Sequence, residues 1–205
     1  MGAAPTAEVA KMMGGKGMML GVHGIPGPAI ETQTFDGIKA ALALCPGIKL
    51  DDSVVGQYNP TTAKTKVLKH LSTHPGPIDG VVDATIMGPG ILSAFEQSGR
   101  TVPPLADPAA TEGTLAYLKA HPDYRAAGSA QGAETTGAVI DDATLRMLSG
   151  EGPELNSIVL PTPLITRSNL GDYTFGSDMS SAASVEPPSA TYPPSGFIDV
   201  IFGTH

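Results

Sequence analysis

The side chains most able to contact a ligand follow directly after short apolar segments of the sequence. They are polar or aromatic groups in five stretches: His23–Gly27, Gln57–Asn59, Asp83–Thr85, Asp107–Pro108 and Ala130–Gln131. If the apolar segments are parallel strands of one sheet, their carboxyl ends share an edge, and ligands of such sheets bind outside that edge. Asp83 and Asp107 are the carboxylates of this set. We therefore expect a ligand site where these stretches meet.

Phosphate-binding and hydrolytic chemistry find little support in the motifs. The turn Gly21–Gly27 lacks the Gly-x-Gly-x-x-Gly spacing, and Pro26 and Pro28 remove two backbone donors that would face a phosphate. No Gly-x-Ser-x-Gly nucleophile elbow occurs in the sequence. We therefore predict no catalytic residues, no cofactor and no enzymatic activity.

A metal site is equally poorly supported. The one cysteine, Cys45, rules out an internal disulfide and a cysteine-based zinc site, and a small buried hydrophobic residue is its simplest interpretation. His70 and His74 have the i, i+4 spacing of two ligands on one helix face, but no third ligand accompanies them. We expect these histidines to be a solvated pair at a helix end, and we predict no metal site.

Alternating strands and helices must position the five stretches. Apolar runs of strand length lie at Gly17–His23, Ser53–Val55, Ile78–Val82, Thr101–Ala106 and Tyr124–Ala130. Helical patterns lie between or beside them at Thr6–Met13, Ile30–Cys45, Thr61–Leu71, Gly90–Gln97, Thr111–Ala120 and Glu134–Leu148. Such alternation is typical of βαβ units. It predicts the α/β class, with a doubly wound parallel sheet and helices on both faces, because the crossovers are right-handed.

The alternation ends after Leu155. Ser157–Ile165 is a further extended run, and its two prolines exclude a central antiparallel strand. The stretch from Ser168 to His205 is rich in Ser, Pro and Gly, which favours an extended strap on the surface. Its apolar end, Phe197–Phe202, is too hydrophobic for a free tail, so we expect it to dock as a short helix or strand.

The composition limits the partners that we expect. The chain has 205 residues, 41% of them apolar and 16% charged, which permits a packed core and is unlike a disordered segment. A net charge of −8 repels phosphate backbones, so we expect no nucleic-acid partner. No apolar run approaches the ~18 residues of a membrane helix. Met1–Gly15 lacks the pattern of a signal peptide, and we expect no membrane insertion.

The order of these segments resembles the periplasmic sugar-binding proteins of ABC transporters, of the ribose-binding type. The resemblance runs from about Thr6 to Leu170. Its most specific stretches are Ala130-Gln131, Arg146–Glu151 and Leu160–Thr166 with Asn169. Weaker landmarks are Gly14–Gly17, Gly24–Gly27, His74-Pro75 and Pro103–Asp107.

The resemblance implies one lobe of a type I periplasmic binding protein. In that family two flavodoxin-like lobes are joined by a hinge of three crossings and hold a sugar between them. This chain matches only the later half, with the N-terminal lobe mostly missing, so we expect a truncated or partial chain. Two regions follow: residues 1–166, an α/β lobe with hinge segments near 130 and 160, and residues 167–205, the strap.

The resemblance also implies ligand contacts. Tyr58 corresponds to an aromatic residue that packs on the sugar ring, Asp107 to a carboxylate that accepts hydroxyl hydrogen bonds, and Gln131 to an amide at the hinge. Each has a structural alternative: Tyr58 could simply cover the sheet end, Asp107 could cap a helix, and Gln131 could be an ordinary loop residue.

Two positions of the family's binding site differ in this sequence. Thr32, with Thr34 nearby, stands where the family has an arginine, and Ala84 stands where it has an asparagine. The loss of these donors argues against the usual pyranose network. It favours a smaller polyol or a less polar ligand.

The resemblance implies a sugar- or polyol-binding subunit of an ABC importer, located in the periplasm or elsewhere outside the cytoplasm. Its second partner would be the transporter permease, provided that the missing lobe is supplied. The alternative is a flavodoxin-like interaction or regulatory domain that binds no solute. Without the other lobe, the helix Glu134–Leu148 has no sheet to cover. We expect it to fold back on its own lobe or, preferably, to pack against a second copy in a homodimer.

Overall fold

A six-stranded sheet forms the centre of the computed structural model, which describes residues 2–155, 157, 159–160, 162–188 and 196–203. The strand order is β2-β1-β3-β4-β5-β6, and every neighbouring pair is parallel except β5 with β6. The strands are β1 (Lys16–His23), β2 (Gly47–Val55), β3 (Gly80–Asp83), β4 (Leu105–Asp107), β5 (Ala126–Ser129) and β6 (Leu164–Ile165). The predicted α/β class is confirmed. β6 lies at an edge of the sheet, in agreement with the prolines of its segment.

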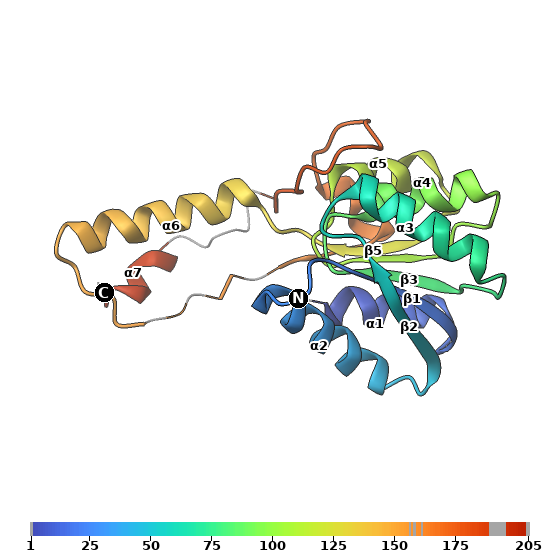
Figure 1. Cartoon of the computed structure of the whole chain (residues 1–205). Helices are drawn as coiled ribbons and strands as arrows, with labels where there is room; N and C mark the ends of the chain where they lie inside the picture. The colour runs from blue at the N-terminus through green and yellow to red at the C-terminus, as the bar shows by residue number, and fades with distance from the viewer. Residues whose placement is uncertain (1, 156, 158, 161, 189–195, 204–205) are drawn as a thin grey trace.

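Helices cover both faces of this sheet (Figure 1). The helices are α1 (Ala3–Met12), α2 (Ala29–Ala43), α3 (Pro60–Thr73), α4 (Gly88–Ser98), α5 (Glu112–Ala120), α6 (Ala133–Leu148) and α7 (Phe197–Ile201), with a 3-10 helix at Arg167–Asp172. α1 and α2 pack together on one face, and α3, α4 and α5 on the other. Among the described residues, none of the helices has both the length and the apolar character needed to cross a membrane.

Local capping fixes where two of these helices begin. Asn59 accepts a hydrogen bond from Thr62 N at 2.9 Å and caps α3, and Thr111 accepts one from Thr114 N at 3.2 Å and caps α5. Such caps satisfy amide donors that the first helical turn leaves free. Because each cap comes shortly after a strand, the short loop that carries Tyr58 and the short loop that follows Asp107 are held against the sheet.

β2 is longer than the predicted strand Ser53–Val55, because it begins at Gly47. The strand lies at an edge of the sheet, and its polar residues interrupt the apolar run by which a strand is recognised. Its register against β1 also shifts: Leu20 lies opposite Asp51, whereas Val22 lies opposite Val54. This bulge adds one residue to β2 just before its carboxyl end.

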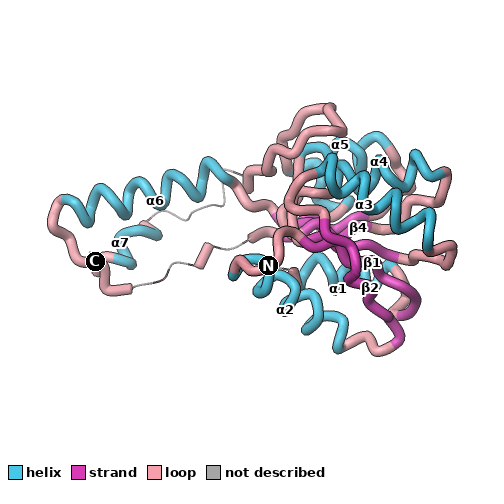
Figure 2. Tube along the Cα trace, in the orientation of Figure 1, coloured by secondary structure: helices cyan, strands magenta, loops and turns pink. Residues whose placement is uncertain are grey.

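α6 leaves the α/β lobe and projects away from it, with α7 packed against its side (Figures 1 and 2). The two helices share a small apolar cluster of Val139, Ile198, Ile201 and Phe202. The prediction that the apolar end docks as a short helix is confirmed. Of the two arrangements expected for α6, folding back onto its own lobe is not found, because α7 covers one side of the helix instead. The preferred arrangement, a homodimer, stays a prediction.

The segment between the 3-10 helix and α7 is bonded to the start of two helices. Val185 N donates to Ala110 O, and Glu112 N donates to Ala183 O, beside the start of α5. Glu186 then accepts hydrogen bonds from Glu134 N and Thr135 Oγ1, each at 2.9 Å, at the start of α6. Residues 189–195 and 204–205 of the predicted strap lie outside the described residues.

Candidate functional site

The carboxyl ends of β1 to β5 meet along what we call the C-terminal edge: residues 23–28, 56–59, 83–88, 107–111 and 130–132. The strand order reverses at β1, because β2 lies on one side of it and β3, the next strand in sequence, lies on the other. Ligands of open parallel sheets bind at such a topological switch point. Among the described residues, the non-glycine residues with positive φ all lie here: Gln57 (60°), Tyr58 (54°) and Ile86 (52°). Strained backbone of this kind gathers at functional sites. The C-terminal edge is therefore the candidate site.

Tyr58 lies half-buried after β2. Its hydroxyl donates to Glu31 Oε2 at 2.7 Å. Its ring lies so close over Gly24 that a Cβ atom at that glycine would collide with the ring carbons. Burial, followed by the hydrogen bond to Glu31, raises the pKa of the Tyr58 hydroxyl far above its usual value, so this group stays protonated.

Asp107 is fully buried at the end of β4. Its Oδ2 accepts from Thr114 Oγ1 at 2.8 Å and from Thr111 N at 3.3 Å. Burial disfavours the charged form and raises the pKa of Asp107 to about 7, although both hydrogen bonds act in the opposite direction. Asp107 is thus not itself the N-cap of α5, which is Thr111, but it holds that cap in place through Thr111 N and Thr114 Oγ1. Its second oxygen has no hydrogen-bond partner among the described residues.

Asp83 ends the neighbouring strand β3 and is also fully buried. Its Oδ2 accepts from Met87 N at 2.8 Å. Burial, followed by the charge of Asp107, raises the pKa of Asp83 well above its usual value. The two adjacent strands thus carry a pair of buried carboxyl groups that favour protonation.

Gln131 follows β5, where the chain turns toward α6. The preceding Ala130 N donates to Pro163 O at 2.9 Å, so the outgoing and returning segments are bonded to each other here. The buried side-chain polar atoms without a partner among the described residues are Asp83 Oδ1, Asp107 Oδ1 and Gln131 Nε2. All of them belong to the C-terminal edge.

The other two residues implied by the resemblance lie in different surroundings. Ala84 is buried after β3, where its N–H donates to Val22 O at 2.9 Å, and it offers no polar side chain. Thr32 is exposed on α2, whereas Thr34 on the same helix is buried. The structure thus brings Tyr58, Asp107, Gln131 and Ala84 to one edge and places Thr32 on the surface of the helix that follows β1.

Sequence reasoning missed Glu31 and left Asp83 out of the final set of contacts. Glu31 is only 5% exposed, in the first turn of α2. A glutamate in a first turn is a common helix-start signal, so its identity alone gave no reason to single it out. Asp83 stood directly after an apolar run, and that position was the available signal.

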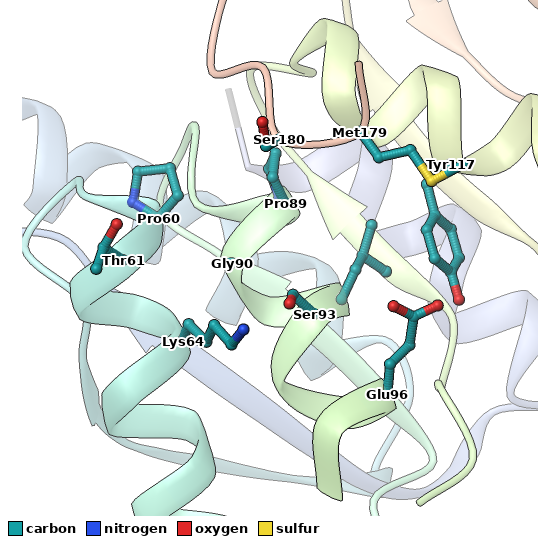
Figure 3. A pocket seen from close by; sticks show the side chains of 11 residues that line it. Pro60, Thr61, Lys64, Pro89, Gly90, Ser93, Glu96, Tyr117, Met179 and Ser180 are labelled. Atoms are coloured by element: carbon teal, nitrogen blue, oxygen red, sulfur yellow. The ribbon is translucent and has the colours of Figure 1, made fainter. Parts of the chain in front are cut away.

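A separate hollow of about 450 Å³ lies between α3, α4 and α5 (Figure 3). Lys64, Ser93, Glu96 and Tyr117 line it, with Met179 and Ser180 closing one side. Burial, and then Glu96, raises the pKa of Tyr117 to about 12. This hollow lies among helices rather than at the strand ends.

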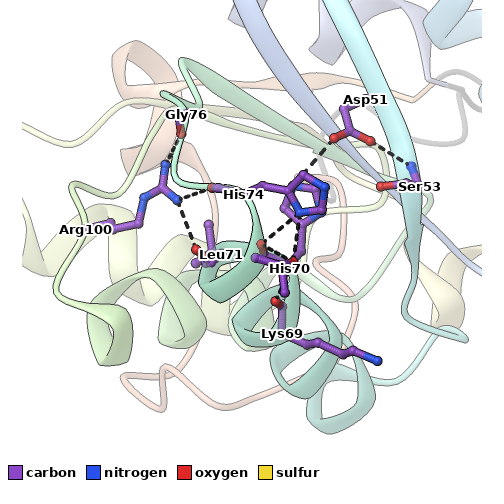
Figure 4. A network of polar contacts seen from close by, with 9 residues as sticks. Asp51, Ser53, Lys69, His70, Leu71, His74, Gly76 and Arg100 are labelled. Atoms are coloured by element: carbon purple, nitrogen blue, oxygen red, sulfur yellow. Dashed lines mark hydrogen bonds and ion pairs between the residues drawn. The ribbon is translucent and has the colours of Figure 1, made fainter.

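His70 and His74 form part of a polar network beside the edge strand β2 (Figure 4). Their rings stack with centroids 4.2 Å apart, and His70 Nε2 lies 3.5 Å from Asp51 Oδ2. Arg100 donates to the carbonyls of Leu71, His74 and Gly76 at the end of α3. The expectation of a solvated pair is wrong for His70, which is buried because β2 extends past it. No cluster of three or more potential metal ligands occurs among the described residues.

The strand order β2-β1-β3-β4-β5, with helices on both faces, is that of a flavodoxin-like lobe. The sequence model described as "Periplasmic binding protein domain" matches residues 1–152. The chain therefore belongs to the periplasmic binding protein domain family, which consists of solute carriers rather than enzymes. The predicted family and the prediction of no enzymatic activity are confirmed. Among curated proteins, no sequence matches the chain.

Solved structures of solute-binding proteins share the fold. A protein from Thermobispora bispora DSM 43833 is 23% identical, with a TM-score of 0.70 over 87% of this chain and 54% of its own. A protein from Bacillus halodurans C-125 with bound myo-inositol is 20% identical, with a TM-score of 0.74 over 83% and 58%. A protein from Actinobacillus succinogenes 130z with bound D-allose is 20% identical, with a TM-score of 0.72 over 84% and 60%. The chain thus spans little more than half the length of these proteins.

Proposed function

We propose that the chain binds a sugar or polyol at its C-terminal edge, as part of a solute-binding protein of an ABC importer. The observation that carries this proposal is the position of three buried side-chain atoms that lack a partner among the described residues: Asp83 Oδ1, Asp107 Oδ1 and Gln131 Nε2 all lie at this edge. Buried polar atoms in folded proteins almost always have partners, and a ligand's hydroxyl groups would supply them. Membership in the periplasmic binding protein family supports the same reading.

Each residue at the edge would have a distinct role toward such a ligand. Tyr58 offers a ring against the apolar CH groups of a sugar or polyol. Asp107 would accept a hydroxyl hydrogen bond, and its pKa of about 7 lets it donate one when protonated. Gln131 would donate through Nε2. Ala84 and Thr32 supply no counterpart to the asparagine and arginine of the ribose-binding type, which favours a smaller or less polar ligand.

We propose that the chain forms one lobe of the two-lobed arrangement that its resemblance to the ribose-binding type implies. The predicted lobe, residues 1–166, would have its hinge segments near 130 and 160, where α6 leaves the sheet, and the predicted strap would begin at residue 167. The bond between Ala130 N and Pro163 O supports two hinge segments that lie side by side. The function would be exercised outside the cytoplasm, with the importer's permease as the partner of the complete protein.

Exposed apolar side chains on α6 suggest that another protein surface covers this helix. Ile140, Leu145, Met147 and Leu148 are all more than half exposed on this helix. Exposing several such side chains forfeits about 1.5–3 kcal/mol each relative to burial. We propose that a second copy of the chain covers this face when no other lobe is present. The same face favours the alternative function, an interaction domain that binds no solute.

Sedimentation equilibrium at micromolar concentration tests the dimer. We expect a mass near twice 20.9 kDa for the wild-type chain, and a monomer for Met147→Asp, which places a charge on the proposed interface. Asp123→Asn, an exposed position on the α/β lobe away from α6, is the control and should remain dimeric. A wild-type monomer at all concentrations would contradict the dimer.

Calorimetric titration tests solute binding itself. We expect saturable heats with myo-inositol, D-allose or D-arabinose, and none with L-leucine, a solute without a polyol face. The dissociation constant should be millimolar or weaker, because water is not excluded from a ligand that is held from one side only. Asp107→Ala should weaken binding. If myo-inositol, D-allose and D-arabinose all fail to bind while the α6 interface forms, the alternative function, an interaction domain that binds no solute, is favoured.

A further inference from the structure

Glu31 ties together three segments of the C-terminal edge. Its Oε1 lies 2.6 Å from His23 Nδ1, at the end of β1. Its Oε2 accepts from Gly24 N at 3.0 Å and from the hydroxyl of Tyr58 at 2.7 Å. The loop after β1 and the loop after β2 are therefore joined through one side chain of α2.

The carboxylate of Glu31 is engaged at both of its oxygens by these contacts. A buried charge is costly unless it is paired and hydrogen-bonded, and three polar partners surround this one. The position in the first turn of α2 adds the favourable field of the helix N-terminus. Both oxygens of Glu31 already have hydrogen-bond partners within the chain. We therefore expect Glu31 to affect ligand binding through the residues that it contacts and not by contacting the ligand.

The neighbour most affected is Tyr58. Gln57 and Tyr58 both have left-handed backbone, which non-glycine residues adopt rarely, and something must hold them there. The ring of Tyr58 rests on Gly24, where no Cβ atom could fit. The ring is thus fixed at one end by its hydroxyl bond and along its face by the Gly24 backbone.

We propose that Glu31 is a positioning residue that holds Tyr58 as an apolar platform at the ligand edge. This inference rests on the proposed function. Because the Tyr58 hydroxyl donates its hydrogen bond to Glu31, only the ring surface of Tyr58 would be offered to the ligand. It fits the CH face of a cyclic sugar or polyol, and not a ligand group that needs a hydrogen bond from tyrosine.

The test uses Glu31→Gln, Tyr58→Phe and the double variant, with Asp36→Asn as the control for charge on the same helix. The first readout needs no ligand: NMR spectra of the isotope-labelled aromatic ring at position 58 report how well the ring is held. The second is the dissociation constant for myo-inositol and for D-allose, from amide shifts at rising sugar concentration. Tyr58→Phe removes only one hydroxyl group. It therefore still tests the Glu31–Tyr58 hydrogen bond if Glu31→Gln fails to fold.

We expect Glu31→Gln and Tyr58→Phe each to release the ring and to weaken sugar binding by about fivefold to tenfold, the worth of one such hydrogen bond. The double variant should bind no more weakly than Glu31→Gln, and Asp36→Asn should match the wild type. An unmoved ring in both single variants would overturn the inference, as would a released ring with unchanged affinity. Losses that add in the double variant would also overturn it, since Glu31 would then act independently of Tyr58.

The failure of the proposed function gives a different result. In that case the wild-type chain shows no saturable amide shifts with myo-inositol or D-allose, and the role of Tyr58 as a ligand platform is rejected together with the proposed function. The ring spectra still decide whether Glu31 holds Tyr58.

Discussion

Asp83 and Asp107 are fully buried, and each has one carboxyl oxygen without a partner among the described residues. Their burial couples folding to protonation. Both have raised pKa values in the folded chain, Asp107 to about 7, whereas an unfolded aspartate titrates near 3.9. The folded state therefore binds more protons between these values. Their contribution to stability is fully present below about pH 4 and is lost as the pH rises through about 7 and above.

The first prediction concerns Asp107→Asn, which keeps the shape of the side chain without its charge. We expect the wild-type free energy of unfolding to fall by up to about 1.4 kcal/mol per pH unit for each retained proton between pH 4 and 7. The fall should be visibly smaller in Asp107→Asn. Urea unfolding at several pH values measures it, with the exposed Asp123→Asn as the control. Parallel pH profiles for Asp107→Asn and the wild type would argue against a buried, proton-binding Asp107.

Residue-level reasoning from the sequence succeeded where position alone was informative. Tyr58, Asp107 and Gln131 each lie at or just after the end of a strand, and the parallel sheet brings their backbones to one edge. The bond between Tyr58 and Glu31 joins residues 27 positions apart in sequence, and neither residue type indicates the other. A helix cap was weighed for Asp107 beside a ligand role. In the structure Thr111 is the cap of α5, one oxygen of Asp107 holds that cap, and the other has no partner among the described residues.

At the scale of elements, the alternation of strands and helices was readable because each buried strand is a short apolar run between turn signals. β2 was placed only in part, because an edge strand can carry polar residues such as Lys49 and Asp52. That error also hid the pairing of Asp51 with His70: the histidine was expected in solvent, and its Nε2 instead lies 3.5 Å from Asp51 Oδ2. The course of α6 depends on contacts that its own sequence does not specify.

The joining of α6 and α7 gives an element-scale prediction. Arg146 donates to Asp199 Oδ1 at 2.7 Å and lies 5.5 Å from the centre of the Phe202 ring. Arg146→Ala should therefore loosen α7, and Phe202→Ala should loosen it further by removing a buried aromatic ring. Hydrogen exchange would show faster exchange over 197–203 and unchanged protection of β1, β3 and β4. Lys11→Ala, which breaks an exposed pair with Glu8, is the control.

Slower exchange at 197–203 than in the wild type, or loss of protection across the sheet, would contradict the prediction that α7 is held by α6 alone. It would mean that α7 depends on the central lobe rather than on α6.

At the scale of the whole molecule, two regions compete as the place where a small ligand binds. One is the C-terminal edge, with its strained loops and its buried polar atoms that lack partners among the described residues. The other is the hollow between α3, α4 and α5, which is lined by Lys64, Ser93 and Tyr117. The topology of the sheet and the family assignment both favour the edge.

Mapping of amide chemical shifts across the labelled chain tests this central claim most directly. Myo-inositol, D-allose and D-arabinose are added in turn, up to high millimolar concentration. The account predicts saturable shifts for at least one of them, strongest at Gly24, Tyr58, Ala84, Asp107 and Gln131. Shifts gathered around Lys64, Ser93 and Tyr117, or no saturable shift with any of the three, would contradict it.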